Sequence, residues 1–192
     1  MKNKKVQNDT ARKLALVGLL TALTAALGFV KIPIIGTYIT LVLPVVVIGV
    51  ALCGPIVGAW LTVVPNIVAI FNAGIFLINS PIGCVFTMLL KGILAGLVAG
   101  LIYKAMSEKH PIGAVTCAAI VAPIINSAVF FLGCYIFIWD DLVAEAAEAG
   151  VGIGMLVLGL VILNGTIELI LNVILCPTIL RLIQIVKKKK FS

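Results

Sequence analysis

The sequence has little of the chemistry that most enzymes and metalloproteins need. It contains a single histidine, His110, and only 11% of its 192 residues carry a charge. A phosphate-binding GxxxxGK[S/T] loop, a zinc-binding HExxH pair and a GxSxG nucleophile turn are all missing. These absences argue against a P-loop NTPase, a zinc metalloprotease and a serine hydrolase of the GxSxG type. We expect neither a catalytic constellation nor a cofactor.

Paired cysteines are missing as well. Five cysteines stand singly in apolar segments, and none forms a CxxC pair or has a neighbouring histidine cluster. Isolated cysteines of this kind are typical of small buried apolar side chains rather than of a disulfide framework or a metal site. They are Cys53, Cys84, Cys117, Cys134 and Cys176.

What the sequence has is apolar residues, at 62%, with charge confined to a few places. Of its 14 lysines and arginines, 12 lie in the N-terminal segment 2–13, in the linker 104–109 and in the C-terminal segment 181–190. Four acidic residues occupy a different linker, 140–148. Because basic loops stay on the cytoplasmic side of a membrane, this layout predicts an integral membrane protein. The net charge of +7 is then explained by topology and anionic lipid, not by nucleic acid.

A membrane-spanning helix needs about 20 apolar residues, and six segments approach that length. We expect helices at residues 11–30, 38–53, 56–71, 82–106, 112–138 and 151–186. The predicted fold is therefore all-α, a compact bundle of six transmembrane helices. Both termini and the 104–110 turn are expected in the cytoplasm. We expect one membrane domain over residues 1–192, with a tail at 1–10, the bundle at 11–186 and a basic tail at 187–192.

Polar residues within these apolar segments are the first candidates for a binding site, because polar groups are costly inside a membrane. Lys91, Asn126, Asn164 and Glu168 fall near the middle of predicted helices, and Asn66 lies nearer the outer side. They are candidates to bind a polar ligand. An equally open interpretation is structural: an ion pair between Lys91 and Glu168, with the asparagines joining helices.

The predicted outer loops supply further candidates. Asn72, Phe76 and Asn79 lie in the loop after the third helix, and Tyr38 lies in the loop after the first. Amide and aromatic side chains at these positions can close over a small polar molecule. The alternative is ordinary loop polarity with an aromatic belt at the membrane interface.

Small residues at helical spacing form two ridges, and such ridges let helices approach closely. On the fourth helix, Gly92, Gly96 and Gly100 favour packing within the chain. The first helix is expected at the outside of the bundle, where its ridge can contact a partner chain. That ridge consists of Ala11, Ala15, Gly18, Ala22 and Ala26.

The whole chain resembles the substrate-binding S component of energy-coupling factor (ECF) vitamin transporters. The resemblance rests on Ala11-Arg-Lys-Leu-Ala15, Leu52-Cys-Gly-Pro-Ile-Val-Gly58, Leu90-Lys-Gly-Ile-Leu-Ala-Gly96, Ala122-Pro-Ile-Ile-Asn126 and Asn164-Gly-Thr-Ile-Glu168. It implies a non-enzymatic protein of the bacterial plasma membrane that binds a water-soluble vitamin near the outer face. It also implies docking, through the small-residue ridge of the first helix, to a transmembrane T component carried on two ATPase subunits.

The last two motifs look most like the pantothenate-type branch of that family, and an anionic ligand suits Lys91. Riboflavin and folate branches stay open as alternatives. Thiamine fits less well because few aromatic residues are present to hold a cationic ring, and cobalt or nickel branches lack the N-terminal histidines.

Two rival functions come from other classes. One is an S-component-like structural or morphogenesis protein, which needs no polar pocket. The other is a stand-alone channel or proton-coupled carrier that uses Glu168, although the two halves of the chain show no clear internal repeat.

Overall fold

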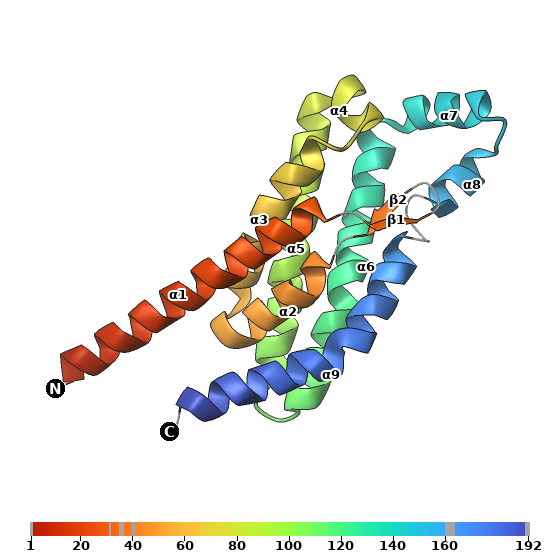
Figure 1. The fold of residues 1–192 in the computed structure, drawn as a ribbon. Coiled ribbons are helices and arrows are strands. Elements are labelled where there is room, and N and C mark those ends of the chain that lie inside the picture. The colour runs from red at the N-terminus through yellow and green to blue at the C-terminus, as the bar shows by residue number, and fades with distance from the viewer. Residues whose placement is uncertain (1, 31, 35–36, 40, 160–163, 191–192) are drawn as a thin grey trace.

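The computed structural model describes residues 2–30, 32–34, 37–39, 41–159 and 164–190, with side chains for residues 10–30, 41–159, 165–176 and 178–185. This part of the chain is mainly helical, with one short hairpin (Figure 1). In chain order the elements are α1 (Lys2–Phe29), β1 (Ile32–Ile34), β2 (Thr37–Ile39), α2 (Val42–Cys53), α3 (Pro55–Ile70), α4 (Ile75–Asn79), α5 (Pro81–Met106), α6 (Pro111–Phe137), α7 (Trp139–Glu148), α8 (Ile153–Val157) and α9 (Asn164–Lys190).

The apolar segments expected at residues 82–106 and 112–138 form α5 and α6, within a residue of the expected bounds. Each begins with a proline in its first turn, where the missing N–H removes no helical hydrogen bond. These two helices and the segment Thr10–Phe29 are long and apolar enough to cross a membrane. A bent pair, Gly165–Cys176 and Thr178–Ile185, which meet at 45°, brings the number to four by length and composition. At 12 and 16 residues, α2 and α3 are shorter, so six crossings stay a prediction.

Several predicted boundaries were wrong. The helix expected from residue 38 begins at Val42, because Ile32–Ile34 pairs antiparallel with Thr37–Ile39 as a hairpin. β-Branched residues in both segments, with one tyrosine in the second, favour that pairing. At the N-terminus, helix begins at Lys2 instead of residue 11.

The acidic linker is a helix, α7, although a loop was expected there. Its buried residues Leu142 and Ala146 lie one turn apart, and Asp140 and Asp141 in its first turn complement the helix dipole. The apolar segment 151–186 is divided between α8 and α9, so the single helix predicted there was wrong. Four glycines between residues 150 and 159 weaken helix formation there.

The described core consists of two apolar clusters. The larger one gathers around α2, whose Val46 and Val47 are fully buried, and includes residues of α6 and α9. The smaller one contains Phe76, Cys84 and Cys134, and lies toward the end of the bundle that carries α4 and α7. Burial of these side chains fixes the relative positions of α5, α6 and α9, which carry the predicted polar site.

The glycine ridge of α5 packs within the chain, as predicted. A Cβ at Gly96 would overlap the Gly58 backbone of α3, and one at Gly100 would lie 2.6 Å from the Pro55 Cβ. At Gly92 the space is filled by the Asn66 and Thr62 side chains of α3. These three glycines allow α3 and α5 to approach closely, as small residues do between membrane helices.

Helix α1 lies at the outside of the bundle, also as predicted (Figure 1). Leu20, Thr24 and Gly28 form its buried face, and Gly28 packs against Pro65 of α3. The opposite face is exposed and carries the small-residue ridge. All five of its members, Ala11, Ala15, Gly18, Ala22 and Ala26, are exposed.

The ends of the bundle differ. The first turns of α1 and the last turns of α9 lie on the side of the bundle that carries the α5–α6 turn (Figure 1). Helices α4 and α7 lie on the opposite side. This relative arrangement is the one that the charge pattern predicts. A cytoplasmic location for the end with the termini stays a prediction.

Candidate functional site

The interior polar site is built around a contact between α6 and α9. The Nδ2 atom of Asn126 donates a hydrogen bond of 3.4 Å to Oε2 of Glu168. Glu168 is only 6% exposed, so its carboxylate lies in the protein interior. A buried carboxylate with one long hydrogen bond retains capacity to accept further donors. The two residues that end the Ala122–Asn126 and Asn164–Glu168 motifs are thus brought together.

Lys91 of α5 lies beside this pair. Its Nζ is 4.7 Å from the centroid of the Phe130 ring, a cation–π contact with α6. Glu168 is close enough to interact electrostatically with Lys91, yet the described residues contain no salt bridge between them. The ion pair between Lys91 and Glu168 that the structural interpretation predicted is therefore not formed in this structure.

Three further polar atoms near this site have no hydrogen-bond partner among the described residues. They are Asn66 Nδ2, Thr87 Oγ1 and Asn172 Oδ1. Thr87 is one turn before Lys91 on α5, and Asn66 packs against Gly92 beside it. Asn172 is one turn after Glu168, and its Nδ2 donates to the Glu168 carbonyl at 3.0 Å. Unpartnered atoms are unusual in a protein interior and mark positions where a ligand or water can bind.

One of the predicted loop residues reaches the neighbourhood of the site. Phe76 of α4 is 3% exposed, and its ring centroid lies 6.4 Å from that of Phe130. Phe130 in turn contacts Lys91. The α4 segment is therefore linked to the polar group through two aromatic rings.

The other loop candidates lie apart. Asn72 and Asn79 are exposed, and the Asn72 amide, in the turn after α3, donates to the Val68 carbonyl of that helix at 2.7 Å. Among the described residues, neither amide is hydrogen-bonded to the interior polar residues, so their ligand role stays a prediction. Tyr38 belongs to β2 and Asn164 is the first residue of α9, but both side chains lie outside the described residues.

Two residues of the site were missed by sequence reasoning. Phe130 is one of several aromatic residues in the apolar helix α6, and only its spacing of four from Asn126 would have pointed to it. Thr87 was missed because a lone threonine is common in membrane helices. Its spacing of four from Lys91 was the available signal.

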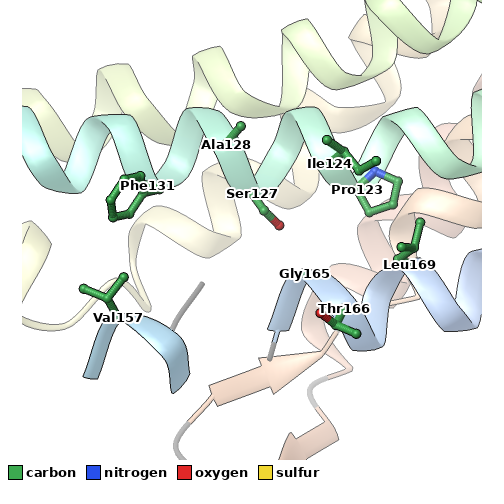
Figure 2. Close-up of a pocket in the computed structure, with 9 residues that line it drawn as sticks. All are labelled: Pro123, Ile124, Ser127, Ala128, Phe131, Val157, Gly165, Thr166 and Leu169. Atoms are coloured by element: carbon green, nitrogen blue, oxygen red, sulfur yellow. The ribbon is translucent and has the colours of Figure 1, made fainter. Parts of the chain in front are cut away.

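A separate cavity of about 380 Å³ lies between α6, α8 and α9 (Figure 2). Its lining is mostly apolar, and Ser127 and Thr166 are the hydroxyl-bearing residues in it. Asn126 and Glu168 do not line it, although Ser127 and Leu169 are their chain neighbours. The described lining residues are Pro123, Ile124, Ser127, Ala128, Phe131, Val157, Gly165, Thr166 and Leu169.

The chemistry of the interior site is that of binding. An ammonium, a carboxylate and amide groups can recognise a small polar molecule by charge and hydrogen bonds. Within the described residues, no group of three or more histidine, cysteine or acidic side chains is placed to hold a metal ion. The five cysteines are free thiols in this structure.

Comparison with known proteins identifies the family. No curated protein and no solved structure matches this chain significantly. The family described as "ECF transporter, substrate-specific component" matches residues 12–180, which is most of the chain. The resemblance noted from the motifs is thereby confirmed, and the chain belongs to the family of substrate-specific components of ECF transporters.

Proposed function

We propose that this chain binds a water-soluble vitamin inside its helix bundle and delivers it across the membrane together with an ATP-driven coupling module. The observation that carries the proposal is the group formed by Lys91, Asn126 and Glu168, which joins α5, α6 and α9 at an incompletely bonded polar site. In a substrate-specific component, such a site is best explained by a ligand.

Pantothenate is the best candidate for that ligand. The Asn126–Glu168 hydrogen bond joins the two motifs that resemble the pantothenate-type branch. Pantothenate carries a carboxylate, an amide and two hydroxyl groups. The hydroxyl groups suit Glu168 and the asparagines, and the carboxylate suits Lys91. Asn66 and Asn164 are further candidates for contact, and riboflavin and folate are the alternative ligands.

The proposed route begins at the end of the bundle that carries α4 and α7. Phe76 of α4 packs on Phe130, which lies against Lys91, so a movement of α4 would change access to the site from that end. The residues at 31–40 are the second proposed cover, and Asn72, Asn79 and Tyr38 are proposed contacts from these covers. After the vitamin has bound, the chain would dock to the coupling module. Rotation of the whole bundle in the membrane would then expose the site to the cytoplasmic side.

The proposed docking surface is the exposed ridge of α1, and its partner is the T component. A Cβ at Gly18 would meet nothing within 4 Å, so packing within this chain does not require a glycine there. A close crossing with a helix of another protein does explain a ridge of small residues on an exposed face. Two ATPase subunits attached to the T component are the proposed source of energy.

The direct test has two parts. Affinity purification from the native membrane should recover a T component and ATPase subunits with the chain. Native mass spectrometry of the purified chain with pantothenate, riboflavin, folate and thiamine should detect a one-to-one complex with one of them. Failure of every vitamin to bind, with no ATPase recovered, would favour a structural membrane protein. Binding of riboflavin or folate alone would keep the transport proposal and replace the ligand.

A further inference from the structure

Two neighbouring groups on α5 lack the partners that their location demands. Thr87 is 2% exposed, and its Oγ1 has no hydrogen-bond partner among the described residues. Within the same part of the chain, the Lys91 ammonium makes neither a hydrogen bond nor a salt bridge, and it lies over the Phe130 ring. The unsatisfied Thr87 hydroxyl is unfavourable in its buried location, and the Lys91 ammonium, on a side chain of intermediate exposure, has no salt bridge among the described residues.

The two groups share one face of α5, because they are four residues apart on a continuous helix. Both are directed toward α6. A Cβ at Gly133 would lie 2.8 Å from the Thr87 Cβ, and Phe130, one turn earlier on α6, contacts Lys91. The hydroxyl and the ammonium therefore lie along the same stretch of the α5–α6 contact.

Their chemistry selects an acceptor that carries negative charge. A lysine ammonium has three N–H donors and no acceptor, and a threonine hydroxyl adds one more donor. A carboxylate is the complement of such a set, because it accepts several hydrogen bonds and neutralises the ammonium. Glu168 is close enough to attract Lys91 but forms no salt bridge with it in the described structure, so the ammonium retains hydrogen-bond donors for a ligand carboxylate.

On the basis of the proposed function, we infer that Thr87 and Lys91 form the subsite for a carboxylate of the ligand. The Asn126–Glu168 pair then takes the neutral, hydrogen-bonding part of the same molecule. The substrate class that follows is a carboxylate-bearing vitamin, and a neutral analogue of the same shape is discriminated against by the unpaired Lys91.

Matched acid and neutral ligands test this inference. The dissociation constants of pantothenate and panthenol, nicotinate and nicotinamide, and biotin and biotinamide are measured on the purified chain, with riboflavin and thiamine alongside. At least one acid should bind about 30-fold or more tightly than its neutral partner, as expected for a buried charge contact. Lys91→Met should reduce that ratio to near one. Thr87→Val should weaken the acid about 5- to 10-fold and leave the neutral partner little changed.

Controls separate this subsite from a structural role. Lys104→Met removes an exposed lysine from the same helix, and Thr24→Val removes a buried hydroxyl that is already bonded to the Thr21 carbonyl at 3.0 Å. Neither should change the acid-to-neutral ratio. The ratio is independent of the folded fraction, so a destabilised Lys91→Met sample still gives an answer, and Lys91→Arg should retain preference for the acid.

Four results overturn the inference, and they differ in what else they reject. Equal binding of acid and neutral partners, or an unchanged ratio in Lys91→Met, rejects the carboxylate subsite and leaves the transport proposal standing. Exclusive binding of riboflavin or thiamine does the same. Failure of every vitamin to bind, together with no recovered ATPase, rejects the transport proposal and the subsite with it.

Discussion

The amide of Asn126 on α6 donates a 3.4 Å hydrogen bond to the carboxylate of Glu168 on α9. This contact joins two helices whose apolar surfaces would otherwise specify little about their mutual rotation. Asn172, one turn further along α9, also points its amide at the Glu168 backbone. The polar groups of α9 are thus held on its buried side, where a ligand between α5, α6 and α9 would meet them.

Asn126→Ala should weaken vitamin binding about 5- to 150-fold, which corresponds to the loss of one hydrogen bond worth about 1–3 kcal/mol. Ser127→Ala is the matched control, because Ser127 lines the separate cavity on the same helix (Figure 2). Titration by native mass spectrometry or calorimetry measures both variants. The opposite pattern, with Ser127→Ala weakened and Asn126→Ala unchanged, would move the ligand to that cavity.

Asn164→Ala should also weaken binding without unfolding the bundle. Asn164 begins α9, one turn before Glu168, and belongs to the motif that ends at Glu168. Unchanged affinity in both Asn164→Ala and Asn126→Ala, with native thermal stability, would place the site among the outer loops. Asn72→Ala and Asn79→Ala would then be the next variants to measure.

The interior site and the chain's long helices differ in how far the sequence predicts them. Long apolar segments bounded by Pro81 and Pro111 defined α5 and α6, because length, apolarity and a first-turn proline all agree. The outcome at α7 was different. Its acidic residues suggested a loop, whereas the burial of Leu142 and Ala146 makes it an amphipathic helix. The two first-turn aspartates and the helical spacing of Leu142 and Ala146 were local signals that the loop prediction overlooked.

Site residues divide along similar lines. Lys91, Asn126 and Glu168 were predicted because a charged or amide group in an apolar segment is conspicuous. Thr87 and Phe130 were not, because their importance comes from what lies opposite them on the neighbouring helix. Gly28 was not singled out either, because its packing on Pro65 depends on where α3 lies.

The α3–α5 crossing predicts a strong effect of a single methyl group. Gly96→Ala places a Cβ against the backbone of Gly58, which cannot move as a side chain can. We expect a loss of about 1–3 kcal/mol or more in stability, as is typical of overpacking. Gly113→Ala is the control, since its Cβ would have an ordinary contact of 3.6 Å with the His110 Cβ. Equal melting temperatures of the two variants in detergent would contradict a tight crossing.

Cysteine labelling tests the predicted orientation. In a background without the five native cysteines, Asp141→Cys on α7 should react with an impermeant maleimide added outside the cell. Ser107→Cys, in the turn at the opposite end, should react only after the membrane is opened (Figure 1). The expectation follows from the basic residues beside Ser107 and the acidic residues around Asp141. The reverse labelling pattern would reject the cytoplasmic location of the termini and the proposed side of ligand entry.

A double variant distinguishes a binding role of Lys91 from a structural one. If Lys91 and Glu168 serve only to balance each other, Lys91→Met should lower thermal stability and Glu168→Gln should restore it in the double variant. We expect instead that an acid vitamin binds the double variant as weakly as it binds Lys91→Met, because both variants lack the ammonium that is proposed to contact its carboxylate. Thermal unfolding and ligand titration on the wild type, the two single variants and the double variant separate these outcomes.

Bulk on the exposed face of α1 should block transport and spare binding. Gly18→Leu adds a side chain where this chain has open space, so the isolated protein should keep its fold and its affinity for the vitamin. Ala15→Trp and Ala22→Trp act on the same exposed ridge and should behave alike, because a close helix crossing excludes bulky groups.

The matched control for this ridge is Gly28→Leu on the buried face of α1. A Cβ there would lie 2.9 Å from the Pro65 Cβ, so this variant should lose stability and lower binding and transport together. Transport is measured as uptake of labelled vitamin in cells, docking by co-purification of the T component, and binding on the isolated chain. If Gly18→Leu lowers vitamin binding as much as transport, the ridge serves the chain's own fold. If transport and co-purification are both normal in Gly18→Leu and Ala15→Trp, the T component docks on another face.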